Sequence, residues 1–360
     1  MTQQLEFGWF LPTSGDTTAY GVPEETVEIT PDYLRQVVSA AEAAGFEYLL
    51  IPVDQRCWEA YIAGAFIAAH SKTIAPLIAA RPGYINPVLL AKMIATFDQF
   101  SGGRIRVNLI AGQAETEVRA EGIQYAKEDR YALMEEEVSI LKALWTADRP
   151  LDFNGRFHQL TGASITPKPI QKPHPSFYLG GGSEEAWAMS ARYSDVHLFW
   201  GDMPDRIAAN IADIRARAGQ HDRADKIGFG MRLQIICRES EADALAAADK
   251  LIHHMPEVMR ETLKRETANS AANRRVQELA AEQGLWIAPH LWSGLTRFRR
   301  GAGIAVVGDP GQCAATLQQF IDAGCHSFCL SGYLHHEEAE RFGRLVRPLL
   351  AERNPGLMAA

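Results

Sequence analysis

Arg232 and Gln234 are the polar residues that first indicate chemistry in this sequence. They interrupt the run 227–239 (IGFGMRLQIICRE), which is otherwise typical of a buried strand. Residues two apart point to the same face of a strand, so Arg232 and Gln234 would share one face. The other face would carry Met231, Leu233 and Ile235. Because a buried cation needs an anion, Arg232 either forms a structural ion pair or binds an anionic ligand, and a parallel barrel would favour the ligand.

The glycine-rich turn 180–183 (GGGS) is a second candidate site. It follows a predicted strand and precedes a predicted helix, so its backbone N–H groups and the helix N-terminus could bind a phosphate. A plain strand–helix turn is the alternative, because the motif is neither GxGxxG nor a Walker loop. Arg130 and Tyr131, at the start of another predicted helix, could donate to the same phosphate, although an arginine in a first turn is usually solvated.

Three aromatic residues, Trp58, Trp200 and Tyr333, lie at or just beyond predicted strand ends. A flat aromatic ligand could lie against them, and each could instead belong to the core. Cys57 would by default be an inert buried thiol. The polar loop that it shares with Arg56 makes a thiol in the site plausible.

Two histidines, His335 and His336, follow Tyr333 and are candidates for a general acid or base. The surrounding LHHEE sequence has no third ligand at the spacing of zinc proteases, so no metal site is predicted. The five cysteines include no CxxC pair and are expected to be reduced thiols.

The elements that would position these residues alternate regularly. Short apolar runs predict eight strands, at residues 6–12, 46–52, 73–81, 104–112, 176–180, 195–202, 227–239 and 326–333. Amphipathic helices separate nearly all of them. Eight β/α units predict a TIM barrel, with a doubly wound open sheet as the alternative. In a barrel the active site lies at the C-terminal strand ends, so the loops that follow these runs should converge.

The predicted helices begin and end at recognisable residues. They cover residues 31–44, 60–71, 87–101, 129–146, 184–193, 204–219, 240–253 and 337–350. A surface hairpin is expected at 151–160, around the Asn154–Gly155 turn. Residues 254–309 have no single clear period. We therefore expect one domain over residues 1–360, with an insertion at about 254–309.

Composition limits the classes of partner. The chain has 360 residues, 47% of them apolar, and a net charge of −8. No basic block interrupts its mixed charges, which argues against a general nucleic-acid surface. The first 20 residues lack a signal-peptide pattern, and no later run reaches about 18 uncharged apolar residues. We expect a soluble cytoplasmic protein that acts on a small molecule.

Ten motifs together resemble a known family. They are WFLPTSGD, LLIPVDQRCWEA, RPGYINP, DRYA, FYLGGGS, FWGD, FGMRLQIICRE, HLWSG, RRGAGIAVVGD and LSGYLHHEEA, and they span about residues 6–350. Their order and spacing are similar to those of the bacterial luciferase-like monooxygenases, closest to the reduced-flavin-dependent alkanesulfonate monooxygenases. The resemblance implies a TIM barrel with a mobile loop after strand seven. It also implies a reaction in which reduced flavin mononucleotide (FMN) and molecular oxygen cleave a carbon–sulfur bond, giving an aldehyde and sulfite.

The resemblance also implies roles for individual residues. It assigns catalytic or substrate-pocket positions to Arg232, Cys57, Tyr333, Arg299, Trp200 and His335. It assigns flavin contacts to Asn108, Tyr131, Gly182 and Ser183. Among these, Arg232 matches the arginine that binds the sulfonate, and Arg299 matches an arginine of the mobile loop that closes over the ligands. The implied partners are a separate NAD(P)H-dependent flavin reductase and further copies of the chain, in a homodimer or homotetramer.

Two positions depart from the family pattern. Ser14 and Gln234 stand where the alkanesulfonate enzymes have histidines. Both keep a polar, uncharged group, and with Asp54 and Gln55 they would form a more hydrogen-bonding pocket than an alkyl chain needs. We therefore expect a hydroxylated sulfonate, such as sulfoquinovose. The alternatives are a luciferase-like or deazaflavin-dependent oxidoreductase acting on an aldehyde or alcohol, and a flavin-binding barrel without activity.

Overall fold

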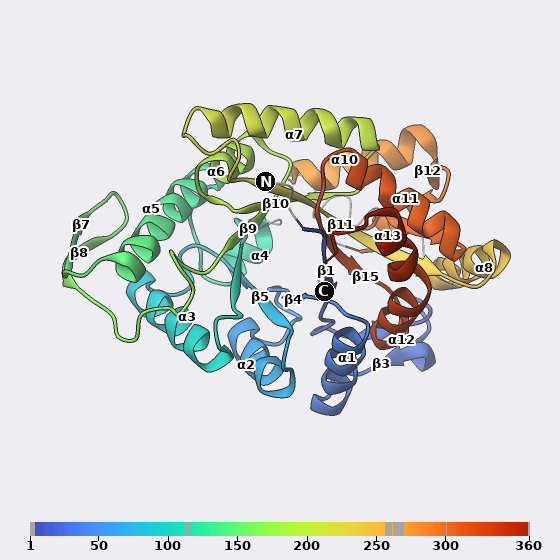
Figure 1. Ribbon diagram of the computed structural model, residues 1–360, viewed down its shortest axis with the longest axis horizontal. Coiled ribbons are helices and arrows are strands. Elements are labelled where there is room, and N and C mark those ends of the chain that lie inside the picture. Colours follow the sequence, from blue (N-terminus) through green and yellow to red (C-terminus); the bar gives the residue numbers. More distant parts are fainter. Residues whose placement is uncertain (1–3, 113–114, 256–260, 262–269, 300, 359–360) are drawn as a thin grey trace.

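The computed structural model describes residues 4–112, 115–255, 261, 270–299 and 301–358. Within these residues, eight parallel strands close into a barrel surrounded by helices (Figure 1). The barrel strands are β1 (Glu6–Phe10), β4 (Tyr48–Ile51), β5 (Ala75–Ala80), β6 (Arg106–Leu109), β9 (Phe177–Gly180), β10 (Val196–Trp200), β11 (Gly228–Cys237) and β15 (Ser327–Ser331). Pairing of β1 with β15 closes the ring, with Gly8 opposite Cys329. The predicted TIM barrel is confirmed, and the open-sheet alternative is wrong.

Helices cover the outside of the barrel. Those that alternate with the barrel strands are α1 (Pro31–Ala43), α2 (Ala60–His70), α3 (Pro87–Ser101), α5 (Lys127–Thr146), α6 (Glu184–Tyr193), α7 (Pro204–Gly219), α8 (Glu241–Ile252) and α11 (Pro310–Asp322). The predicted last helix is divided into α12 (His335–Arg341), a π-helical turn (Phe342–Val346) and α13 (Arg347–Arg353). Among the described residues, none of these helices is both long and apolar enough to cross a membrane.

Smaller elements complete the connections. The predicted surface hairpin is confirmed as β7 (Leu151–Asn154) and β8 (Gln159–Ala163), which project from the barrel in Figure 1. The loop after β1 contains β2 (Asp16–Thr17), a 3₁₀ turn (Pro23–Glu25) and β3 (Thr26–Val27). A short helix that the sequence did not predict, α4 (Glu115–Ala120), precedes α5.

The insertion after strand seven contains more regular structure than its sequence indicates. Its described part forms α10 (Ala271–Gln283), β12 (Trp286–Ala288), β13 (Leu291–Trp292), a 3₁₀ turn (Gly294–Arg297) and β14 (Ala305–Gly308). β14 runs parallel to the second half of the long strand β11, with Gln234 opposite Ala305. β13 and β12 extend this pairing antiparallel. The chain thus returns from the insertion directly beside the barrel strand that carries Arg232.

The side chains of β11 alternate between two environments, as predicted. Met231, Leu233 and Ile235 are buried in the main hydrophobic core, which lies between the strands and the helices. Arg232 and Gln234 point to the other side, and Arg232 lies over the Phe10 ring. A strand with a charged residue inside a barrel is unusual because barrel interiors are normally filled by apolar side chains.

The N-terminal end of the barrel interior is closed by a polar network, which we call the barrel floor. It consists of Glu6, Tyr48, Arg106, Tyr178 and Ser327. Nη1 of Arg106 donates to Glu6 Oε2 and to the Tyr178 hydroxyl, both at 2.7 Å, and the Ser327 hydroxyl donates to Glu6 Oε1 at 2.7 Å. Burial alone would raise the pKa of Glu6, but Arg106 and these hydroxyls hold it below its usual value. The floor is therefore a satisfied ion pair.

Candidate active site

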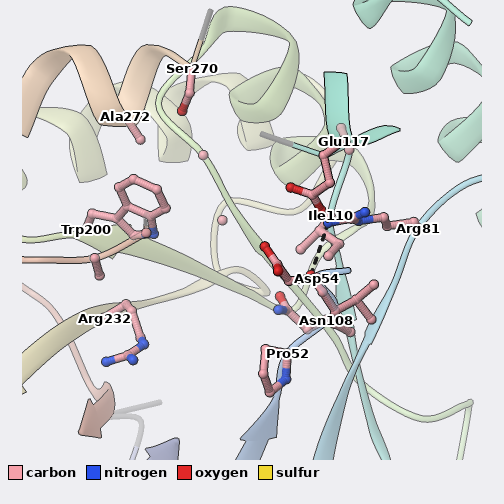
Figure 2. Close-up of a pocket in the computed structure, with 18 of the residues that line it drawn as sticks. Pro52, Asp54, Arg81, Asn108, Ile110, Glu117, Trp200, Arg232, Ser270 and Ala272 are labelled. Atoms are coloured by element: carbon pink, nitrogen blue, oxygen red, sulfur yellow. Dashed lines mark hydrogen bonds and ion pairs between the residues drawn. The ribbon is translucent and has the colours of Figure 1, made fainter. Parts of the chain in front are cut away.

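A cavity of about 620 Å³ lies at the C-terminal ends of the barrel strands. Among the described residues, seven of the eight strand ends or the loops after them contribute to its wall, as expected, and the loop after β15 does not. Nine of the residues predicted for the site line this cavity: Ser14, Cys57, Asn108, Tyr131, Gly182, Ser183, Trp200, Arg232 and Arg299. In Figure 2, Arg232 and Trp200 lie on one side of the cavity, and Asn108 and Pro52 on the other. Three predicted residues, Gln234, Tyr333 and His335, are not among those that line it.

Arg232 is a buried cation on the cavity wall, with only 6% of its surface exposed. Its Nη1 donates to the Leu233 carbonyl at 2.8 Å, and its guanidinium lies 4.7 Å from the centre of the Phe10 ring. Burial lowers the pKa of Arg232, and the nearby Arg299 cation lowers it further. In the described part of the chain Arg232 has no carboxylate partner, so the structural ion pair considered for it is not formed there. Its charge remains available to a ligand.

Arg299 reaches the cavity from the insertion, and two tyrosines fix its position. Its Nη1 donates to the Tyr333 hydroxyl at 2.7 Å, and the Tyr20 hydroxyl donates to the same oxygen at 2.7 Å. Tyr333 therefore lies behind Arg299, as a partner of the arginine. Tyr20, in the loop after β1, had no sequence signal that linked it to the site.

His335 belongs to a buried cluster beside the cavity. Its Nδ1 lies 2.8 Å from Asp16 Oδ2, and its backbone N–H donates to the same oxygen at 2.7 Å. The Tyr33 hydroxyl also donates to Asp16. Burial would raise the pKa of Asp16, but His335 holds it below its usual value. His335 Nε2 has no hydrogen-bond partner among the described residues. Sequence reasoning missed Asp16, although the predicted loop TSGD contains it.

Cys57 lies on the cavity wall in the loop after β4. Burial raises the pKa of its thiol, although the nearby Thr13 and Ser14 side chains oppose this shift. The sulfur is therefore a neutral thiol at neutral pH and a poor nucleophile. Asp54, in the same loop, also lines the cavity, whereas Trp58 is 43% exposed and lies outside the lining, as does Gln55.

The glycine turn after β9 has the geometry of an anion site. Gly181 has a φ of +143°, and a Cβ there would lie 2.8 Å from the Ala186 Cβ, so only glycine fits without strain. Ser183 caps α6, and the first-turn N–H groups of that helix have no intrahelical acceptor. Lys127 and Tyr131, from the start of α5, line the same cavity. These residues fit the phosphate of a flavin mononucleotide.

Most acidic groups in the cavity wall are paired. Glu117 of α4 forms an ion pair with the buried Arg81 (Figure 2), and Glu115 pairs with Arg130 at 3.1 Å. Arg130 also donates to the carbonyls of Ala111 and Tyr125. Arg130 is therefore buried and not solvated, as an arginine in a first helical turn usually is. Instead it holds the loop after β6 against α5.

The insertion covers the mouth of the cavity next to the glycine turn. Ser270, Ala271 and Ala272, at the start of α10, line the cavity, and Figure 2 shows Ser270 and Ala272 above Trp200. Arg275 of α10 binds both oxygens of the buried Asp202, at 2.8 and 3.0 Å. This bidentate pair joins α10 to the loop after β10.

A protein-family model also matches most of this chain. The model for luciferase-like monooxygenases matches residues 5–327. The chain belongs to the luciferase-like monooxygenase family. The predicted family is confirmed at this level.

Solved structures share the fold of this luciferase-like monooxygenase. The riboflavin lyase RcaE, with modified FMN and riboflavin, superposes with a TM-score of 0.83 and 19% identity, covering 99% of this chain and 93% of that one. DmoA from Hyphomicrobium sulfonivorans gives 0.80 and 16%, covering 98% and 89%. EDTA monooxygenase (EmoA) from Chelativorans sp. BNC1 gives 0.79 and 15%, covering 98% and 94%. At these identities the similarity concerns the fold.

Proposed function

We propose that this luciferase-like monooxygenase uses reduced FMN and oxygen to release sulfite from an organosulfonate. The observation that carries the proposal is Arg232, a buried cation on the cavity wall without a carboxylate partner among the described residues. A sulfonate oxygen pair can accept the parallel N–H bonds of a guanidinium. Arg299 adds a second cation to the same wall. An anionic substrate group would relieve the repulsion between them.

The proposed cofactor site lies along the other side of the same cavity. Gly182, Ser183 and Tyr131 would hold the phosphate of FMN, and Asn108 would contact the edge of its ring system. Bound reduced flavin would supply the electrons that activate oxygen. A separate NAD(P)H-dependent reductase in the cytoplasm would deliver it. The cavity volume of about 620 Å³ is in the range of small-molecule and cofactor sites.

We propose a hydroxylated sulfonate, such as sulfoquinovose, as the substrate. Ser14 and Asp54 line the cavity and could bond to substrate hydroxyls. Two further residues that suggested this substrate, Gln55 and Gln234, do not line the cavity. The proposal of a hydroxylated substrate therefore depends on Ser14 and Asp54.

Sulfite release tests the proposed function. The purified protein would be given reduced FMN, oxygen and either hexanesulfonate or sulfoquinovose, and sulfite would be measured. We expect sulfite only when reduced flavin is present, and more of it from sulfoquinovose. Oxidation of an aldehyde or alcohol without sulfite release, with reduced flavin or with a deazaflavin, would instead support the alternative oxidoreductase.

A further inference from the structure

Gln234 joins the insertion to two barrel strands. Its side chain is fully buried on β11. Its Nε2 donates to the Ala302 carbonyl at 3.0 Å, and its Oε1 accepts from the Ser331 hydroxyl of β15 at 2.6 Å. Both polar atoms of the amide therefore have partners, and neither reaches the cavity.

The position requires a side chain that donates and accepts at the same time. A carboxylate could accept from Ser331 but could not donate to the Ala302 carbonyl, and an aliphatic side chain could do neither. Histidine has one donor and one acceptor nitrogen and could do both. Since the Ala302 carbonyl and the Ser331 hydroxyl are buried, losing Gln234 would leave both without this partner.

Ala302 belongs to a stretch that lines the cavity with Arg299 and Gly301. We call these three residues the arginine segment. The chain beyond it is confined on two sides. A Cβ at Gly303 would lie 2.7 Å from the Thr296 backbone nitrogen, and a Cβ at Gly201 would lie 2.4 Å from the Ile304 Cβ. The buried hydrogen bond that the Ala302 carbonyl accepts from Gln234 therefore fixes how far the arginine segment lies from the barrel.

We propose that Gln234 is a positioning residue that holds the arginine segment on the cavity wall and acts on the reaction through Arg299. The inference rests on the proposed role of Arg299 in ligand binding. Gln234 would thus affect the substrate indirectly, and not through the direct contact that the sequence suggested. A displacement of about 1 Å in a binding group can change a rate by roughly a hundredfold, so the position of Arg299 is expected to affect turnover.

Hydrogen exchange tests the positional part without any substrate. Amide exchange over residues 301–305 would be compared in the wild-type protein, Gln234→Leu and Gln234→His. We expect at least tenfold faster exchange in Gln234→Leu and near-wild-type exchange in Gln234→His. Asn354→Leu is the matched control. It removes a buried amide whose Nδ2 donates to Leu350 and Gln318, away from the cavity. Unchanged exchange in Gln234→Leu would overturn the inference.

A double-mutant cycle tests the effect on turnover, measured as sulfite release from sulfoquinovose. We expect Gln234→Leu to lower kcat roughly tenfold. Adding it to Arg299→Ala should lower kcat no further, because both changes act through the same arginine. Independent, multiplying effects, or an equal loss in Asn354→Leu, would overturn the inference. If the wild-type protein releases no sulfite, the proposed function fails, and the exchange experiment decides the inference alone.

Discussion

A single residue, Arg232, distinguishes this barrel interior from a purely structural one. On the described barrel strands, two arginines point into the barrel, and their surroundings differ. Arg106 forms an ion pair with Glu6 in the barrel floor, at 2.7 Å. Arg232 instead contacts the Phe10 ring and two backbone carbonyls, and the Arg299 cation lies nearby. A desolvated charge without a counter-ion destabilises a fold. The anionic substrate that we propose would supply the counter-ion that Arg232 lacks among the described residues.

The first prediction compares these two arginines. Arg232→Lys should lose most of the sulfite-releasing activity, about tenfold or more, because lysine keeps the charge but cannot form two parallel bonds. Its melting temperature should change little. Arg106→Lys is the control and should lower the melting temperature while the folded enzyme stays active. Wild-type turnover in Arg232→Lys, or a loss of stability as large as that of the control, would contradict the assignment.

At the scale of elements, helix α5 supports the loop that follows β5. Glu137 of α5 is buried, and its Oε1 accepts from the Gly83 N–H at 3.0 Å. Glu136 and His158 are titratable groups beside it. Burial, together with the Glu136 charge, raises the pKa of Glu137 to about 7. Folding therefore favours the protonated form of the Glu137 carboxyl group.

The second prediction concerns the pH dependence of stability. Because the folded pKa of Glu137 is about 7 and the usual value is 4.5, its contribution is fully present below about pH 4.5 and is lost as the pH rises through 7. The loss amounts to about 3 kcal/mol at most. Glu137→Gln keeps the acceptor for Gly83 but does not ionise, so its unfolding free energy should decline less between pH 5 and 7.5. Urea unfolding at both pH values would measure this. Parallel declines in both proteins would refute the prediction.

The elements differ in how well their sequences predicted them. The eight barrel strands were recognisable because each is a short apolar run between amphipathic helices. β14 and α11 were missed although GIAVVGD and the Asp309 capping box, with Gln312 at its third helical position, were readable signals. β14 pairs only with the far half of β11, a non-local contact that periodicity does not indicate. α4 follows Gly112 closely and is too short to show a period.

The candidate site, like the elements, was predicted only in part, because some of its contacts join residues that are far apart in the sequence. Strand alternation correctly put Gln234 on the same side as Arg232. It could not indicate that Ser331 and Ala302 enclose the Gln234 side chain, because these partners come from distant parts of the chain. The same applies to Tyr20 and Asp16, whose partners Tyr333 and His335 are about 300 residues away in sequence.

At the scale of the whole molecule, we propose that the protein binds FMN that is already reduced. The third prediction tests this proposal. Anaerobic titration should show at least about tenfold tighter binding of reduced FMN than of oxidised FMN, since oxidised flavin must leave after each turnover. Fluorescence quenching would measure both affinities. Equal affinities, or oxidised flavin retained through purification, would count against a two-component system.

The surface of the molecule also suggests self-association, which gives the fourth prediction. α2 carries apolar residues on most sides, yet Ile62 is 74% exposed, and Leu89 in the first turn of neighbouring α3 is 54% exposed. We propose that a second copy of the chain covers them. Light scattering should give a dimer or tetramer for the wild-type protein and a monomer for Ile62→Asp with Leu89→Asp. Leu245→Asp, on α8, is the control. An unchanged mass in the double variant would exclude this interface.

Because of the barrel floor, the cavity opens at only one end of the barrel in the described part of the chain. In the described part of the chain, the network of Glu6, Arg106 and Tyr178 closes one end of the barrel, and α10 partly covers the other. A ligand that reaches Arg232 must therefore leave by the path along which it arrived. Spent cofactor and products would therefore share one exit with the ligands that enter.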